Sequence, residues 1–188
     1  MVPSSPNCRL SGALGGAFRV IGAVALLVMS SATVAWSPAS AASRTEKTFG
    51  SWAVVCVEPE NEAKACSMMQ SIAQVDKQTN KQRLLLRWVI SINKNHEQTQ
   101  VLAVPAGVSI KEGLRLLLGD AEPIVIGYSV CGPQVCIAET PLDAKGLAAI
   151  KASKKASVSY VRGSKQLAQV QLDLNGFGEA FDFLTQQL

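Results

Sequence analysis

Residues 84–92, LLLRWVISI, decide the fold class of this chain. Every second residue of the stretch is apolar: Leu84, Leu86, Trp88, Ile90 and Ile92. Successive side chains of a β-strand point to opposite sides of its sheet. The alternation therefore predicts one long strand with a strongly apolar face.

The same period of two recurs through much of the chain. It covers residues 52–56, 66–72, 124–130, 158–160 and 168–174. Turn-forming residues separate these runs, at 59–64, 76–81, 93–98, 105–107, 119–120, 132–133 and 162–164. Many short strands at this spacing are typical of an antiparallel sandwich or barrel, and we predict an all-β fold, an antiparallel β-sandwich.

Two segments favour helix instead of strand. Thr140 and Pro141 are suited to the N-cap and first position of a helix near 141–152, in which Leu142, Leu147 and Ile150 recur at helical spacing. A second helix is predicted at the C-terminal end, from about residue 179 to residue 187, because its apolar residues Phe181 and Leu184 fall on one face.

The first 42 residues have the order of a secretory signal peptide. Arg9 and Arg19 supply positive charge, an apolar run follows at 20–34, and the small residues ASAA at 39–42 offer cleavage after Ala41 or Ala42. The apolar run is shorter than the ~18 to 20 residues that a membrane-spanning helix needs. We therefore expect cleavage and no transmembrane helix in the remaining chain. We also expect a location in the periplasm or outside the cell, and the protein could associate with the outer membrane.

Removal of this leader leaves residues 43–188, a usual length for one domain. Sixteen basic and fourteen acidic residues remain, a balance that gives no reason to expect nucleic-acid binding. The local basic cluster of Lys151, Lys154 and Lys155 is typical of a solvated face. We predict a signal peptide at 1–42 and a single β-sandwich domain at 43–188.

The predicted mature chain holds four cysteines, Cys56, Cys66, Cys131 and Cys136, and an even number is typical of disulfides in an oxidising compartment. Four cysteines allow three pairings. Spacing favours Cys56 with Cys66 and Cys131 with Cys136, because a short loop closes at the least entropic cost. Neither pair has the spacing of two residues that is common in structural zinc sites and in redox motifs.

The sequence displays no catalytic constellation. His96 is the single histidine and lies in a polar turn, where an exposed side chain is the simpler interpretation. Asp120 with Glu122 and Glu58 with Glu60 are acidic pairs in turn-like sequence, without an aromatic cleft around them. We therefore predict no catalytic residue, no cofactor and no metal site.

Several short motifs, in order, resemble the invasion-associated locus B family of alphaproteobacterial envelope proteins. They are FGSWAVVC at 49–56, Cys66, VPAGV at 104–108, Gly113, Cys131 to Cys136 leading into Ile137 and Ala138, and LNGF at 174–177. The resemblance implies an exported, immunoglobulin-like β-sandwich with no assigned catalytic residue. One departure from the antibody pattern is that Cys66 lies too close to Cys56 to bridge the two sheets.

The sequence displays no catalytic constellation, and the resemblance implies a non-enzymatic, virulence-associated envelope protein that acts through surface contacts with a protein or envelope component, in support of host-cell invasion or adhesion. A homodimer is a further alternative, because the predicted strands carry apolar residues on both faces, such as Met68, Met69, Leu85 and Val89. They also leave open a periplasmic carrier of a small apolar ligand. A hydrolase is the third alternative, and it would need a polar cluster that the sequence does not display.

Overall fold

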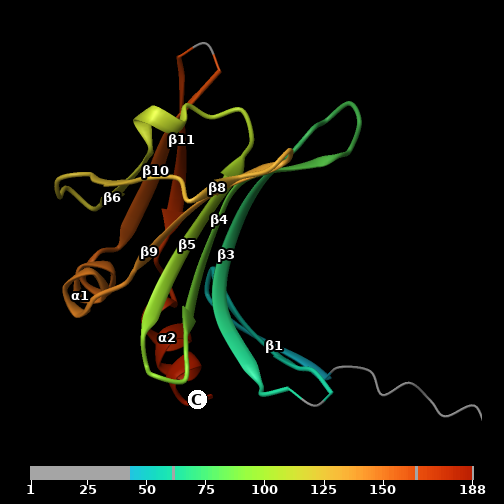
Figure 1. Ribbon diagram of the computed structural model, residues 1–188, viewed down its shortest axis with the longest axis vertical. Helices are drawn as coiled ribbons and strands as arrows, with labels where there is room; N and C mark the ends of the chain where they lie inside the picture. The colour runs from blue at the N-terminus through green and yellow to red at the C-terminus, as the bar shows by residue number, and fades with distance from the viewer. Residues whose placement is uncertain (1–42, 61, 164, 188) are drawn as a thin grey trace, which may run out of the picture. The chain divides into compact units, whose positions relative to one another are not determined.

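Two antiparallel sheets build the part of the chain that the structure, a computed structural model, describes: residues 43–60, 62–163 and 165–187. The larger sheet has the order β1 (Ser43–Phe49), β2 (Trp52–Glu58), β3 (Ala65–Val75), β4 (Gln82–Ile92), β5 (Gln98–Pro105), β9 (Val135–Pro141) and β8 (Val130–Cys131) (Figure 1). The smaller has the order β11 (Gln166–Asp173), β10 (Lys155–Arg162), β6 (Leu114–Leu118) and β7 (Ile124–Ile126). The helices are η1 (Ile110–Glu112), α1 (Ala144–Ala152) and α2 (Phe177–Thr185). The predicted signal peptide at 1–42 lies outside the described residues.

The long strand predicted from the alternation at 84–92 is β4, near the middle of the larger sheet. Its inward residues Leu86, Trp88 and Ile90 are fully buried. They share one core cluster with inward residues of the smaller sheet, such as Leu116 and Val158. Because one core lies between the two sheets, the predicted antiparallel β-sandwich is confirmed.

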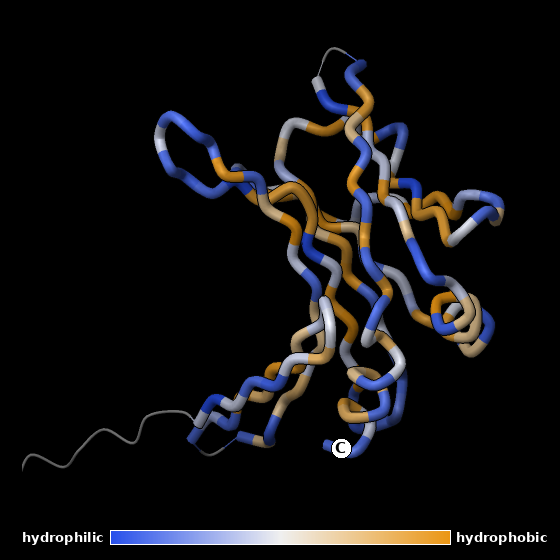
Figure 2. The backbone as a smooth tube through the Cα atoms, turned by 180° about the vertical axis from the view of Figure 1, so that it is seen from behind, coloured by the Kyte–Doolittle hydropathy of each residue, from blue (hydrophilic) through white to orange (hydrophobic). Residues whose placement is uncertain are grey.

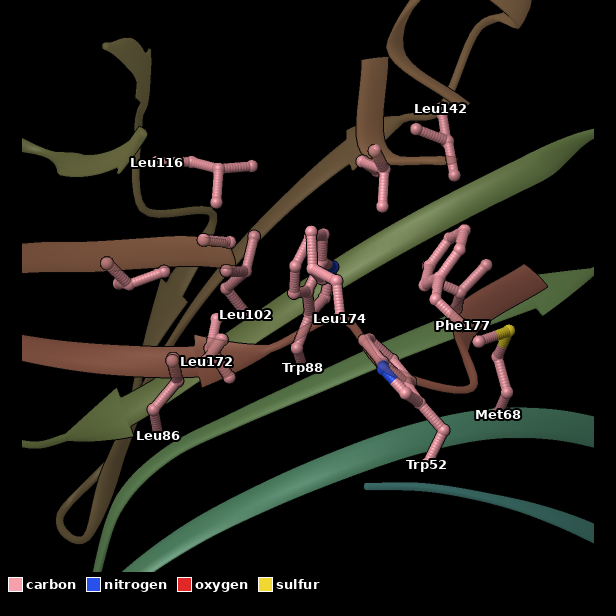
Figure 3. Packing of buried hydrophobic residues seen from close by; sticks show 14 of the residues in the cluster. Trp52, Met68, Leu86, Trp88, Leu102, Leu116, Leu142, Leu172, Leu174 and Phe177 are labelled. Carbon is pink, nitrogen blue, oxygen red and sulfur yellow. The ribbon is translucent and has the colours of Figure 1, made fainter. Parts of the chain in front are cut away.

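Aromatic side chains fill the end of this core nearest α2 (Figure 3). The ring of Trp52 packs edge-on against Trp88, at 5.5 Å between centroids, and against Phe177 of α2, at 5.1 Å. Such edge-to-face pairs contribute about 0.5 to 1.5 kcal/mol each beyond the area they bury. The helix α2 therefore covers the inward face of β2.

The run at 124–130, predicted as one strand, is two strands in different sheets. Residues 124–126 form β7 of the smaller sheet, whereas Val130 and Cys131 form β8 of the larger sheet. Gly127 lies between them. The prediction of one strand was wrong because alternation records which side chains are buried and not to which sheet they belong.

The first long helix begins later than predicted. Asp143 is the N-cap of α1, and its carboxylate accepts a hydrogen bond of 2.7 Å from the backbone N–H of Gly146. Thr140 and Pro141 end β9 instead, paired with β5. Pairing with β5 keeps Thr140 and Pro141 in the sheet, so they cannot start the helix. The Asp143 carboxylate caps the helix instead, where it also interacts favourably with the helix dipole.

The C-terminal helix also differs in its bounds. The helix α2 begins at Phe177, before the predicted start near residue 179, and ends at Thr185. Strands β1, β5, β6 and β9 were not among the runs predicted from alternation. Figure 2 shows that hydrophobic residues follow the strands, whereas the tip of the β3–β4 hairpin is hydrophilic.

Candidate binding surfaces

The outward face of the larger sheet carries a stripe of apolar side chains. Its members, hereafter the outer stripe, are Ala53, Met69, Val89, Val101, Ala103, Ile137 and Val130. Strand pairing places the first four next to one another across β2, β3, β4 and β5, and the last three across β5, β9 and β8. The outward face of an antiparallel sandwich is ordinarily polar, so an apolar stripe on this face is unusual.

Residues of the outer stripe point away from the core. Trp88 and Ile90 on either side of Val89 are fully buried, whereas Val89 keeps part of its surface exposed. Val130 is 57% exposed. The stripe is therefore an apolar surface on the side of the sheet opposite to α2.

A second feature lies at the end of the smaller sheet. Strand β7 pairs with β6 on one side and with no described strand on the other. Ile124 and Val125 are 48% and 62% exposed there. Beside them, a hollow of about 500 Å³ opens between β7, β9 and α1, and its apolar wall includes Ile126, Leu142 and Ala149. We call this the β7 hollow.

Gln100 of β5 brings a polar group to the β7 hollow. Its side chain is only 7% exposed, and its Oε1 atom is buried without a hydrogen-bond partner among the described residues. The other deeply buried glutamine differs, because Gln70 Nε2 donates to the backbone oxygens of Ser51 at 3.2 Å and Asp173 at 2.7 Å. Gln70 Nε2 thus ties the two sheets together, although the Oε1 atoms of Gln70, Gln98 and Gln100 are all buried without a partner among the described residues.

A second hollow, of about 690 Å³, lies at the end of the sandwich near the β4–β5 turn. Ala65, Cys66 and Ile92 contribute carbon and sulfur surface, and Lys64 and His96 lie at its margin. Lys64 Nζ donates to Gln187 Oε1 at 2.7 Å, which connects the β2–β3 loop to the residues after α2. The hollow can accept a small, largely apolar molecule.

The four cysteines form two close pairs. Cys56 and Cys66 face each other on β2 and β3, with their sulfur atoms 2.05 Å apart. Cys131 and Cys136 face each other on β8 and β9, with their sulfur atoms 2.04 Å apart. Both pairs join neighbouring strands of the larger sheet. The disulfide connectivity stays a prediction, which peptide mapping tests.

The other residues considered from sequence lie apart from one another. His96 is exposed in the β4–β5 turn, with φ at +61°. The acidic pairs, Asp120 with Glu122 and Glu58 with Glu60, are all exposed. Within residues 43–60, 62–163 and 165–187, no three His, Cys, Asp or Glu side chains gather as metal ligands would. Nor is any described helix long and apolar enough to cross a membrane.

Two tyrosines have altered acidity because they are partly buried. Burial raises the pKa of Tyr128 to about 12, and the nearby Tyr160 adds to the shift. Burial also raises the pKa of Tyr160. The Tyr160 hydroxyl donates to the backbone oxygen of Leu85 at 3.0 Å, whereas the buried Tyr128 hydroxyl has no partner among the described residues. Both phenols are neutral at physiological pH.

Comparison with known proteins decides the family. The sequence pattern of the Invasion associated locus B (IalB) protein family matches residues 52–185, from the start of β2 to the end of α2. This chain belongs to that family. The resemblance expected from the motifs in the sequence is thereby confirmed.

Individual relatives agree with the family. The chain is 31% identical over 142 residues to an Invasion protein B homolog of Brucella abortus (strain 2308), covering 75% of this chain and 79% of the relative. It is 27% identical over 158 residues to Invasion protein B of Bartonella bacilliformis, covering 81% of each. The crystal structure of invasion associated protein B from Bartonella henselae matches with a TM-score of 0.64, over 76% of this chain and 95% of that chain. At 24% identity, this last likeness shows the shared fold.

The structure brings together two IalB-like motifs that are far apart in the sequence. The backbone N–H of Ser51, in the motif at 49–56, donates to the backbone oxygen of Asn175, in the motif at 174–177, at 3.3 Å. The Ser51 hydroxyl also donates to Asp173 Oδ2 at 3.1 Å. These motifs therefore hold the β1–β2 turn against the start of α2, a structural role.

Part of the candidate surfaces could be predicted from the sequence, and part could not. Met69 and Val89 of the outer stripe are recognisable in the sequence as apolar residues on the second face of their strands. Gln100 and the free side of β7 were not predicted. A glutamine among the apolar inward positions of β5 is the signal that could have drawn attention to the β7 hollow.

Proposed function

We propose that this IalB-family protein works in the cell envelope as a non-enzymatic binding protein, and that the outer stripe is its contact surface for another protein or envelope component. The stripe carries the proposal, because contiguous apolar patches on soluble proteins commonly mark interaction sites. Relatives named as invasion proteins, and not as enzymes, support a binding role.

The chemistry of the stripe favours a macromolecular partner with an apolar surface of its own. Met69 offers a flexible, polarizable side chain, which adapts to differently shaped partners. Val89 and Val101 are stiff and β-branched, so they present a preordered surface that loses little entropy on binding. A second copy of this chain is one partner that meets these requirements.

Site-specific photo-crosslinking in the living envelope tests the proposal. A photoreactive amino acid replaces Val89 in the outer stripe, and in a matched control it replaces Leu167, which is 68% exposed on β11 of the smaller sheet. We expect one discrete crosslinked species from position 89 and none from position 167. The mass of this crosslinked species distinguishes a second copy of the chain from a different protein. The proposal would be contradicted if position 89 gave no crosslinked species, or if both positions gave the same one.

The names of the relatives support extending the proposal to host-cell invasion or adhesion. A strain that lacks the gene would receive either the unaltered gene or the Val89→Lys variant, and Leu167→Lys would serve as the control. We expect the Val89→Lys strain to enter or adhere to host cells as poorly as the strain without the gene. Normal entry with a folded, exported Val89→Lys protein would refute this extension.

The hollow near the β4–β5 turn favours a second candidate function, carriage of a small apolar ligand. At about 690 Å³ it falls within the usual range for small-molecule sites. Native mass spectrometry of protein taken from its own envelope would reveal a carried molecule as added mass. Bare protein mass in every preparation would exclude this candidate.

A further inference from the structure

We propose that the β7 hollow binds an extended polypeptide segment, which pairs with the free side of β7, places an aliphatic side chain in the hollow and hydrogen-bonds the carboxamide of Gln100. This site is separate from the outer stripe. The hollow lies between β7, β9 and α1, whereas the stripe crosses the outward face of the larger sheet.

The free side of β7 supplies the first element of recognition. A strand at the end of a sheet presents unpaired backbone N–H and C=O groups, which pair readily with another extended segment. Natural proteins protect such strands with charged residues, proline, bulges or a covering segment. The sequence of β7 is IVI, and Val125 is 62% exposed, so β7 itself carries no charged residue that would discourage pairing.

The apolar wall of the hollow supplies the second element. Successive side chains of an added strand would alternate between solvent and the sandwich. A side chain that points inward meets Ile126, Leu142 and Ala149. These surfaces favour an aliphatic group, because binding there removes its apolar surface from water.

Gln100 supplies the third and most specific element. A buried polar atom without a partner is energetically unfavourable, and the Oε1 atom of Gln100 has no partner among the described residues. A carboxamide both donates and accepts hydrogen bonds. A peptide group is its natural complement, because it offers one donor and one acceptor in one plane.

The charges around the hollow favour an uncharged segment. Glu139, Asp143 and Lys145 line it, and the Asp143 carboxylate is engaged with the backbone N–H of Gly146 at the start of α1. The helix N-terminus offsets part of the Asp143 charge, and Glu139 and Lys145 have opposite signs. Neither an anion nor a cation is therefore strongly attracted, and an aliphatic stretch of polypeptide matches the site.

A nuclear magnetic resonance titration tests the proposal on protein recovered from the periplasm of expressing cells. The probe is the soluble peptide acetyl-Ser-Val-Ser-Val-Ser-amide, which places both valines on one face of an extended strand. We expect saturable shifts of the Val125 backbone amide signal and of the Gln100 side-chain amide signals. The Leu167 signal, at the other end of the smaller sheet, should stay unchanged.

Two controls separate strand pairing from general apolar binding. The same peptide with methylated backbone nitrogens cannot donate hydrogen bonds, so it should lose at least tenfold in affinity. The Gln100→Leu substitution should raise the Kd of the original peptide roughly fivefold to tenfold. Gln98→Leu changes a neighbouring inward glutamine of β5 that does not line the hollow, and it should change Kd less than twofold.

Three outcomes would overturn the proposal. They are no shift at millimolar peptide, undiminished binding of the methylated peptide, and a Val125 shift that depends on protein concentration alone, as a second copy at β7 would produce. The photo-crosslinking at position 89 concerns different residues. Failure of the peptide titration therefore leaves the outer stripe untouched, and failure of the crosslinking leaves the β7 hollow untouched.

Discussion

Gly176 lies so close to the backbone carbonyl of Phe49 that a Cβ atom built on Gly176 would overlap the carbonyl oxygen. The φ of Gly176 is +81°, a conformation that side chains with a Cβ disfavour. The relationship is reciprocal, because a Cβ on Gly50 would lie 2.6 Å from the backbone oxygen of Asn175. Two distant turns thus interlock through glycines, and neither tolerates a side chain.

The Gly176→Ala substitution should lower the free energy of unfolding by about 3 to 5 kcal/mol, because it adds both a backbone clash and left-handed strain. Gly178→Ala is the matched control. Gly178 lies two residues further on, inside α2, with open space where a Cβ would stand, so alanine should stabilise by up to about 1 kcal/mol. Denaturant unfolding of both variants checks the prediction. Equal stability of the two variants would show that the turns do not interlock as described.

Alkaline pH should destabilise the protein through Tyr128. Burial holds the pKa of Tyr128 at about 12 in the folded chain, against a usual value near 10 in the unfolded chain. Between these values the unfolded chain binds fewer protons, so stability falls as the pH rises from 10 to 12 and is fully present below 10. Unfolding curves at closely spaced pH values should show a shallower decline for Tyr128→Phe. If stability declined equally with pH in the two proteins, the pKa of Tyr128 would have to be the same in the folded and unfolded chain.

The Tyr160→Phe substitution should behave differently from Tyr128→Phe at neutral pH. Tyr160 donates a hydrogen bond to the part-buried backbone oxygen of Leu85 across the two sheets, so its loss should cost about 0.5 to 1.5 kcal/mol. The Tyr128 hydroxyl has no partner among the described residues, so Tyr128→Phe should be neutral or slightly stabilising. Chemical denaturation at pH 7 measures both. A larger loss for Tyr128→Phe would contradict this assignment of the two hydroxyls.

The fold could be predicted from sequence wherever burial alternates within one sheet. Residues 84–92 are the clearest case, because one face of β4 is fully buried. At 124–130 the same alternation continues while the chain passes from one sheet to the other, so the break at Gly127 was invisible. At Thr140 and Pro141, a local helix signal lost to strand pairing with β5. Tertiary pairing overrides local preference in both places.

The candidate surfaces were harder to predict because they depend on register. Apolar residues on the outward face of β3 and β4 were visible in the sequence, but their alignment with Val101 follows only from strand pairing. The β7 hollow depends on α1, β7 and β9 meeting around Gln100. Residues distant in sequence meet there, and a single sequence carries no record of such contacts.

The processed N-terminus should be Ala42 or Ser43, as the small residues at 39–42 predict. Strand β1 begins at Ser43, so cleavage after Ala42 would leave its pairing with β2 intact. Intact mass measurement of the protein from the envelope fraction checks the prediction. Recovery of the full-length chain with Met1 in the membrane fraction would contradict it.

Non-reducing peptide mapping should link Cys56 to Cys66 and Cys131 to Cys136, since each pair lies opposite on neighbouring strands. The bridges span 10 and 5 residues of sequence, so by restricting the unfolded chain they should contribute about 2.7 and about 2.1 kcal/mol, respectively. Because a domain commonly has ~5 to 15 kcal/mol of net stability, reduction of both bridges should lower the Tm strongly.

The variant with both Cys131 and Cys136 replaced by Ser tests the shorter bridge alone, and it should retain the fold. A linked peptide joining Cys56 to Cys131 would refute the pairing, and four free thiols in protein from the envelope would refute the expectation of export to an oxidising compartment.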